Sequence, residues 1–282
     1  MNLSEFDSWI GRERTARDEI TAFPINALSA TLDREDPEAV AGTPVPPLWH
    51  WLYFLAIYRP GQMRKDGHLQ GGDFMPPLPL PRRVWAGSKF SWNAANPLRV
   101  GDQATRVSRI ASITSKEGRS GELAFVKLVH EYHNANGLCF TNDHMAAFRG
   151  EPKAEVKAEP AAAEQVSQWH RELLPDTPLL FRYSALMFNS HRIHYDTPYA
   201  VQEEKYPAIL VQGPLLATLL MDLLRRNAPD ALVRTLEFKA VRSAFVGRPL
   251  HLRGQPDGDK VRLWAADDEG RLVMSAQAEL GN

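Results

Sequence analysis

The chain has 282 residues, of which 44% are hydrophobic and 24% charged, and its formal net charge at pH 7 is −1. This length suffices for two units of roughly 130 residues, each large enough to bury its own core. The near-neutral charge, without a Lys/Arg-rich tract, argues against nucleic acid and against an anionic membrane surface as partners.

The cysteine count and the N-terminus bear on the cellular compartment. Cys139 is the single cysteine, so no internal disulfide can form and a reducing compartment is expected. Residues 1–20 carry acidic groups and lack the long apolar core of a secretory signal. No apolar stretch reaches the length needed to cross a bilayer. The sequence therefore predicts a cytoplasmic protein that is not inserted in a membrane.

Residues 1–149 are expected to form the first unit. Two short helical patterns open it, and a Gly/Pro segment leads into an aromatic run with strand character. A long loop rich in Gly and Pro follows, and loops of such length are often functional. Alternating apolar and polar residues then predict successive antiparallel strands. In chain order these elements are helices at 3–10 and 25–32, the Gly/Pro segment 41–47, a strand at 49–58, the loop 61–81, and strands at 83–92, 102–115, 122–134 and 137–148.

Residues 150–168 are predicted to be a linker, because the segment from 150 to 165 consists mainly of Lys, Glu, Ala and Pro and offers few large apolar groups to a core. Residues 169–282 form the predicted second unit, whose order of a helix followed by antiparallel strands loosely repeats that of the first. Its predicted elements are strand 179–186, helix 213–226, and strands 236–244, 249–253, 260–267 and 272–280. This pattern indicates an α+β protein.

The segment 181–200, FRYSALMFNSHRIHYDTPYA, is the most informative part of the sequence. Asn189 and His194 are five positions apart, and a bend in the chain would aim both side chains into one cleft. An imidazole is suited to proton transfer because its ordinary pKa lies near neutral pH. This segment therefore predicts acid/base chemistry.

A helix start follows closely at Gln212-Gly213-Pro214. Glycine permits close approach of a ligand to the backbone, and proline suits the first turn because its missing N–H costs nothing there. The N–H groups at a helix start, together with the positive end of the helix dipole, can polarise a carbonyl that becomes an enolate. We expect the N–H of Gly213 to bind the oxygen of a thioester.

These residues resemble the MaoC-like hydratases and dehydratases of the hot-dog fold. In that family an acidic residue precedes the catalytic histidine by five positions, and a helix introduced by a His-Gly or similar pair follows. His194 matches the histidine, Asn189 falls where the family has Asp, and Gln212-Gly213 falls where the helix begins. The resemblance is closest to the double-hot-dog branch that contains itaconyl-CoA hydratase, mesaconyl-C4-CoA hydratase and the type 2 3-hydroxyacyl-thioester dehydratase. Its supporting stretches are 48–54, 77–92, 97–102 and 188–196.

The resemblance implies a double hot-dog, with antiparallel sheets that each wrap around a central helix. Residues 169–282 would be the catalytic hot-dog, and residues 1–149 a degenerate one that shapes the acyl pocket. Aromatic residues of the first unit are candidates for lining that pocket, although aromatic side chains in strands more often belong to the core. They are Trp49, Trp51, Phe54, Trp85 and Trp92.

The amide at position 189 changes the expected mechanism. A carboxamide can orient a water molecule but cannot exchange protons near neutral pH. We therefore expect His194 alone to take the proton from water and return one to the α-carbon, while Asn189 orients the water and Gly213 holds the enolate. Asp196 and Tyr195 are close enough in the sequence to compete for the second role.

Substrate contacts are predicted for Arg192, Arg182, Tyr195 and Gln212. Arginine binds carboxylates bidentately, so either arginine is a candidate for a dicarboxylic acyl group or for a phosphate of coenzyme A, with a solvated surface position as the alternative. No cofactor is expected beyond the coenzyme A of the substrate.

A metal ion is not expected. His191 and His194 have an HxxH spacing, but two ligands are too few and neither HExxH nor a cysteine partner accompanies them. His191 is expected to hold the loop through hydrogen bonds instead.

Two classes of function follow from these residues. The first is an acyl-thioester hydratase that acts on a C5 dicarboxylic acyl-CoA, with a 3-hydroxyacyl-thioester dehydratase as the alternative in substrate. The second is a non-catalytic subunit that binds acyl-thioesters. Exposed sheet edges in this fold are commonly covered by pairing, which is compatible with a homodimer.

Overall fold

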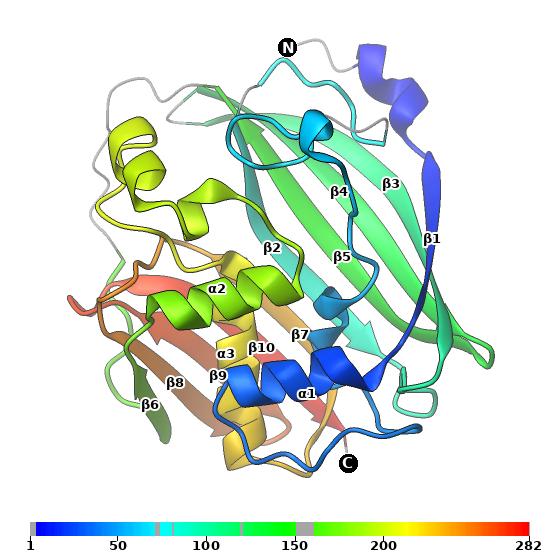
Figure 1. The fold of residues 1–282 in the computed structure, drawn as a ribbon, viewed down its shortest axis with the longest axis vertical. Coiled ribbons are helices and arrows are strands. Elements are labelled where there is room, and N and C mark those ends of the chain that lie inside the picture. Colours follow the sequence, from blue (N-terminus) through cyan, green and yellow to red (C-terminus); the bar gives the residue numbers. More distant parts are fainter. Residues whose placement is uncertain (1–3, 71–73, 81, 119–120, 151–160, 282) are drawn as a thin grey trace.

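The computed structural model describes residues 4–70, 74–80, 82–118, 121–150 and 161–281. Its strands form a ten-stranded antiparallel sheet in the order β1-β3-β4-β5-β2-β7-β10-β9-β8-β6. Strands from the first half of the chain lie on one side of the β2–β7 pair, and strands from the second half lie on the other (Figure 1). The strands are β1 Glu13–Glu19, β2 Arg82–Trp92, β3 Gln103–Gly118, β4 Gly121–Asn134, β5 Gly137–Arg149, β6 Trp169–Leu173, β7 Leu232–Ala240, β8 Leu250–Asp257, β9 Lys260–Ala266 and β10 Leu272–Gly281.

The two halves meet where β2 approaches β7 most closely. The two strands pair from Gly87↔Lys239 to Ser91↔Thr235, just after an irregularity between Trp85 and Gly87. A Cβ atom on Gly87 would come within 2.4 Å of the backbone oxygen of Phe238, and its φ of +157° lies where glycine is favoured. Glycine is thus required for the pairing that makes one continuous sheet.

Helix α3, Gly213–Asn227, is the central helix of the second half. Every residue from Leu215 to Leu224 is buried, and the helix packs on β6, β8, β9 and β10. This burial explains why the sequence LLATLLMDLLRR is apolar nearly all round. The helix predicted at 213–226 is confirmed, as are the strands predicted at 236–244, 249–253, 260–267 and 272–280, with shifted ends.

Asp222 is a charged side chain inside this otherwise apolar helix, and it is fully buried. Its carboxylate accepts hydrogen bonds from Arg34 at 2.6 Å, Arg171 at 2.6 Å and Arg226 at 2.8 Å. Arg34 follows α1, Ala22–Thr31, in the first half, so this ion-pair network connects the two halves of the chain.

Replacing Asp222 by Ala should lower the free energy of unfolding by about 3–5 kcal/mol, because three guanidinium groups would lose their buried counter-charge. Chemical denaturation measures the change, with Asp230→Ala, an exposed position just after α3, as the matched control. A loss no larger than that of the control would show that the network does not stabilise the fold.

In the described residues of the first half, no long helix packs against the sheet. Instead the short 3-10 helix Trp49–Leu52 and the residues after it fill the core, and His50 lies among the rings of Phe90, Tyr132 and Phe140. The strand predicted at 49–58 is therefore wrong. Trp49, Tyr53 and Phe54 of this run are buried in a compact turn after Leu48, whose φ of 71° interrupts any extended pairing.

The strand predicted at 179–186 is also wrong, because helix α2 spans Thr177–Leu186. Asp176 caps it by accepting a hydrogen bond from the N–H of Leu179 at 2.9 Å, and Pro178 occupies the first turn. The buried positions Leu180, Tyr183 and Ser184 have helical spacing. Strands β1 and β6 at the sheet edges were not predicted, since their sequences are mostly charged or polar.

The predicted linker 150–168 is described only in part, since residues 151–160 lie outside the described residues. Ala162 pairs with Arg271, and Ala163 is buried against Trp264. The end of this segment thus packs on the second half, while the predicted domain limits stay a prediction. Among the described residues, no helix is long and apolar enough to cross a membrane.

Candidate active site

The predicted bend in the motif segment follows the end of α2. Phe188 has a φ of 49°, and the N–H of Asn189 donates to the carbonyl of Ser184 at 2.8 Å. The Oδ1 of Asn189 accepts from the N–H of His191 at 3.1 Å, which is a local turn of the kind asparagine favours. The carboxamide NH₂ is the part of Asn189 that remains to donate to a ligand.

His194 lies at the end of the short helix Arg192–His194 and is 9% exposed. Its Nδ1 lies 2.8 Å from the carbonyl oxygen of Leu210. Because a carbonyl can only accept, Nδ1 must carry the proton and Nε2 must carry the lone pair. This tautomer gives His194 the form of a base.

Burial lowers the pKa of His194 to about 4, against the opposing effect of the Leu210 hydrogen bond, with a further lowering from nearby His68. The imidazole is therefore neutral at pH 7.

If His194 is the base, kcat/KM should be nearly constant from about pH 8 to about pH 5.5 and then fall, because the base form is lost only as the pH drops through the folded pKa of about 4. A pH profile within the range where the protein stays folded measures this. A fall centred near pH 6.5, the ordinary histidine value, would contradict it.

Helix α3 begins at Gly213 with Gln212 before it and without a side-chain cap among the described residues. The N–H groups of its first turn are consequently available to a ligand. A Cβ atom on Gly213 would lie 3.6 Å from the ring of Trp85, which is an ordinary contact, so the residues packed around Gly213 leave room for a side chain.

Backbone and side-chain hydrogen bonds hold His194 near this helix start. Leu210, which accepts from His194, lies three residues before Gly213. The Nε2 of Gln212 donates to the carbonyl of Leu180 at 2.9 Å and to Ser184 Oγ at 2.8 Å, both on α2. These hydrogen bonds join the residues just before α3 to His194 and to α2. Gln212, predicted to bind substrate, is buried and connects the two helices.

The other predicted binding residues occupy different surroundings. Arg192 is held by Asp196, to which its Nε donates at 2.9 Å, and its guanidinium lies 4.1 Å from the centre of the Tyr199 ring. The Arg192 hydrogen bond also lowers the pKa of Asp196, so this carboxylate is engaged as an ion-pair partner. Tyr195 is half exposed and donates from its hydroxyl to the carbonyl of Ser190 at 3.1 Å. Arg182 is exposed on α2.

A cavity of about 420 Å³ opens beside the motif, and Asn189, Ser190 and Tyr195 are among its lining residues. Its wall also includes Tyr58 and Met63 from the first half of the chain. Both halves therefore contribute to the space beside the candidate site. The cavity is predominantly apolar, and His194 and Gly213 are not among its lining residues, so it lies beside the candidate site on the side of Asn189.

The long loop predicted at 61–81 packs against the motif through its first part. Ser190 Oγ donates to the carbonyl of Gly67 at 2.6 Å, and the N–H of Arg192 donates to the carbonyl of Asp66 at 2.9 Å. His68 lies against His191, with ring centres 3.8 Å apart. Burial and the neighbouring His68 lower the pKa of His191 to about 3, so that ring is neutral. The length of the loop predicted a functional role, but nothing in the sequence indicated that it contacts Ser190, His191 and Arg192.

Asp66, His68 and His191 are the described residues that could offer ligands to a metal ion, with ligand atoms within 4.8 Å of one another. The guanidinium of Arg64 already binds the Asp66 carboxylate. The two imidazole rings are tilted by 34° with their centres 3.8 Å apart, so they pack on each other. The arrangement suits a hydrogen-bonded loop contact better than a cation, and the expectation that the site uses no metal stays a prediction.

Two of the predicted acyl-pocket aromatics lie beside the helix start. Trp85, which contacts Gly213, packs edge-on against Trp51 with ring centres 5.5 Å apart and stacks on His144 at 5.5 Å. Trp49 is buried beneath Arg225, and Trp92 stacks on Phe90. Trp51 and Trp85 are therefore the predicted aromatics best placed to meet an acyl group.

Solved structures with similar folds identify the architecture. A MaoC-like dehydratase from Phytophthora capsici superposes with a TM-score of 0.71 over 100% of this chain and 99% of its own, at 12% identity. A Mycobacterium tuberculosis protein described as a double hotdog superposes with a TM-score of 0.59 over 96% of each chain, also at 12% identity. The predicted α+β double hot-dog is thus confirmed.

The chain belongs to the class of acyl-thioester hydratases and dehydratases, which are hydro-lyases, as the sequence matches to this class show. More particularly, the chain belongs to the family of hydroxyacyl-thioester dehydratase type 2, whose sequence model matches residues 48–246. It is 40% identical over 286 aligned positions to a mesaconyl-C(4)-CoA hydratase from Chloroflexus aurantiacus, with 100% of each chain covered. The predicted resemblance is confirmed, and an enzyme takes the place of the non-catalytic binding subunit.

Proposed function

We propose that this hydro-lyase acts on mesaconyl-C4-CoA and adds water to form citramalyl-CoA, with His194 as the base. The observation that supports this chemistry is the hydrogen bond from His194 Nδ1 to the carbonyl of Leu210, which leaves the lone pair on Nε2. Leu210 itself lies three residues before the start of α3, which has no side-chain cap among the described residues. The substrate rests on the full-length identity of 40% to a relative named for it.

Hydration begins at the water molecule. The NH₂ group of Asn189 donates to the water oxygen, since the Asn189 Oδ1 is engaged by His191. His194 Nε2 takes one proton while the oxygen bonds to the β-carbon, and the π electrons of the C=C bond move onto the thioester. The resulting enolate oxygen is bound by the N–H of Gly213 at the positive end of α3.

The second step returns the proton. The imidazolium of His194 transfers it to the α-carbon, the enolate collapses to the thioester, and neutral His194 is restored. The low pKa of the buried histidine favours this step, because a weakly basic imidazole gives up its proton readily. Dehydration of a 3-hydroxyacyl-thioester is the same path in reverse.

The alternative substrate is an unbranched 3-hydroxyacyl-thioester, which the family match favours, and itaconyl-CoA is a further candidate. Loss of the enoyl-thioester absorbance is measured with mesaconyl-C4-CoA, itaconyl-CoA and crotonyl-CoA. We expect the highest kcat/KM for mesaconyl-C4-CoA. A higher value for crotonyl-CoA would favour the fatty-acid type of substrate, and no reaction with any thioester would contradict the proposal.

Arg182 is a further part of the proposal, as a contact for the carrier or for the free carboxylate, since it is exposed on α2. Tyr195 takes part through the wall of the cavity beside Asn189, and Arg192, which is held by Asp196, is a second candidate for the same contact as Arg182. A cytoplasmic location and a homodimer agree with the acyl-CoA chemistry. Sedimentation of the purified protein tests the dimer.

A further inference from the structure

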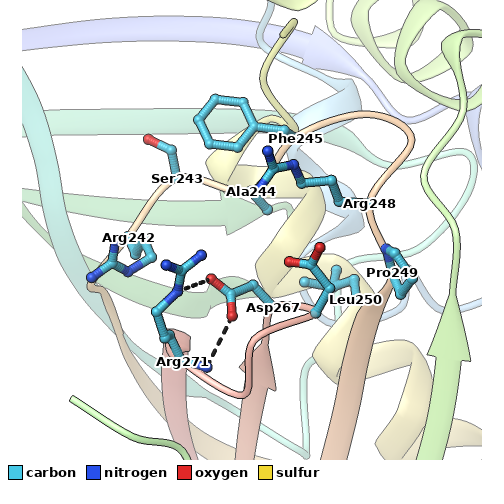
Figure 2. Close-up of a pocket in the computed structure, with 10 residues that line it drawn as sticks. Arg242, Ser243, Ala244, Phe245, Arg248, Pro249, Leu250, Asp267 and Arg271 are labelled. Atoms are coloured by element: carbon cyan, nitrogen blue, oxygen red, sulfur yellow. Dashed lines mark hydrogen bonds and ion pairs between the residues drawn. The ribbon is translucent and has the colours of Figure 1, made fainter. Parts of the chain in front are cut away.

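A second pocket, of about 250 Å³, lies in the C-terminal half. One wall is the loop between β7 and β8, and the other is the turn between β9 and β10 (Figure 2). Its charged lining consists of Arg242, Arg248, Arg271, Asp267 and Asp268.

One of the three arginines has a structural role. The Nε of Arg271 donates to Asp267 at 2.7 Å, as the dashed lines in Figure 2 show in part, and its Nη2 donates to Glu269 at 2.6 Å. Asp267 in addition accepts the N–H groups of Glu269 and Arg271, which fixes the turn. The charges of Arg271 and Asp267 are therefore paired with each other, and the pair holds the turn between β9 and β10.

The other two arginines lack such partners. Within the described part of the chain, neither Arg242 nor Arg248 forms an ion pair with a carboxylate. The Nε of Arg242 is buried and makes no hydrogen bond with any described residue. A buried donor without an acceptor is costly, and that cost is relieved if an anion binds. The pocket thus presents two guanidinium groups that form no ion pair with any described residue, together with the carboxylate of Asp268, so its lining carries a net positive charge.

The loop that carries these arginines is joined to the candidate active site. The N–H of Val211 donates to the carbonyl of Ala244 at 2.9 Å, and the N–H of Val246 donates to the carbonyl of Ile209 at 3.1 Å. Between them, Leu210 accepts the hydrogen bond of His194. The pocket wall therefore pairs with the segment that leads into α3, which places the pocket beside the start of that helix.

We infer that Arg242 and Arg248 bind a phosphate group of the pantetheine carrier, the 3′-phosphate or the pyrophosphate of coenzyme A. The inference rests on the proposed function, because it assigns the carrier end of the same substrate. Guanidinium groups bind phosphate oxygens through paired charge-assisted hydrogen bonds, and two of them facing one pocket match a phosphate better than a single carboxylate.

The test compares Arg242→Ala, Arg248→Ala and the double variant with wild type. The control is Arg14→Ala, an exposed arginine on β1 at the opposite edge of the sheet. Each protein is assayed with the mesaconyl-C4 thioesters of coenzyme A, dephospho-coenzyme A, 4′-phosphopantetheine and pantetheine. Binding of free coenzyme A is measured by calorimetry, and thermal unfolding checks the fold.

The double variant should lose about tenfold or more in kcat/KM with the coenzyme A thioester, mainly through KM, and nothing with the pantetheine thioester. Coenzyme A binding should weaken by a similar factor. A loss confined to the full coenzyme A assigns the 3′-phosphate, a loss shared with dephospho-coenzyme A assigns the pyrophosphate, and a loss shared with 4′-phosphopantetheine indicates a carrier-protein substrate as the other source of the phosphate.

An unchanged kcat/KM and unchanged coenzyme A binding would overturn the inference while leaving the proposed function intact. An equal loss with the pantetheine thioester would also overturn it, since the arginines would then act on the fold or the chemistry. Should wild type turn over none of the thioesters, the proposed function fails, and the calorimetric comparison still decides whether the arginines bind coenzyme A.

Discussion

His194→Ala is expected to lower kcat/KM for mesaconyl-C4-CoA by about 10²–10⁴-fold, the range found when a positioned acid/base group is removed. The variant removes the nitrogen that takes the proton from water and leaves Leu210 without its imidazole partner. Steady-state assays with the enoyl-thioester absorbance measure the loss, and circular dichroism with thermal unfolding shows whether the fold is intact.

Asn189→Ala is the comparison that separates the two roles. Because the amide only orients water, its loss should cost about tenfold, the size of one hydrogen bond. Asp196→Asn keeps the shape of the Arg192 partner and should cost less than His194→Ala, since that carboxylate is held in an ion pair. If His194→Ala retained activity within tenfold of wild type, His194 would not be the base.

Gly213→Pro should lower kcat/KM by about 10²–10³-fold, because it deletes the N–H that holds the enolate and adds no other polar change. Proline is well tolerated at the first position of a helix. Gln212 before it has φ −63° and ψ 135°, the extended conformation that a residue preceding proline prefers. Position 213 also precedes Pro214, where a residue other than glycine disfavours the helical conformation, so thermal unfolding is measured for this variant and for its control.

Gly213→Ala is the matched control, since it keeps the N–H and adds one methyl group. Apart from its chain neighbours, the nearest protein atom to that methyl group is the Trp85 ring at 3.6 Å, and the Ala variant carries the same helical restraint before Pro214 as the Pro variant. A large loss with Ala as well would show that the thioester packs directly on Gly213. Wild-type activity in the Pro variant would mean that the enolate is bound elsewhere.

The sequence predicted α3 and the strands around it because the patterns that mark them lie within each element and do not depend on distant residues. Residues 213–226 are apolar nearly all round and begin with Gly-Pro, so their burial inside a sheet followed directly. Strands β3 and β4 have alternating sequences that end and begin at Gly118 and Gly121, which is a local signal. These patterns could not show that the chain contains two hot-dog units, and that prediction came from the family resemblance.

Features that depend on distant partners could not be predicted. Nothing near Asp222 in the sequence indicates that Arg34 and Arg171 meet it inside the protein. Likewise, the carbonyl of Leu210 carries no sequence signal, although it sets the tautomer of His194. The helix α2 was missed because its Leu and Phe residues outweighed the Asp176 cap and Pro178, which do mark a helix start.

A crystal structure with the saturated analogue methylsuccinyl-CoA tests the account most directly. We expect the thioester oxygen about 3 Å from the Gly213 nitrogen, with the carbon that corresponds to the β-carbon facing His194 Nε2 through a water near Asn189. A thioester bound on another face of the protein, or side chains packed between His194 and Gly213, would contradict the proposed mechanism.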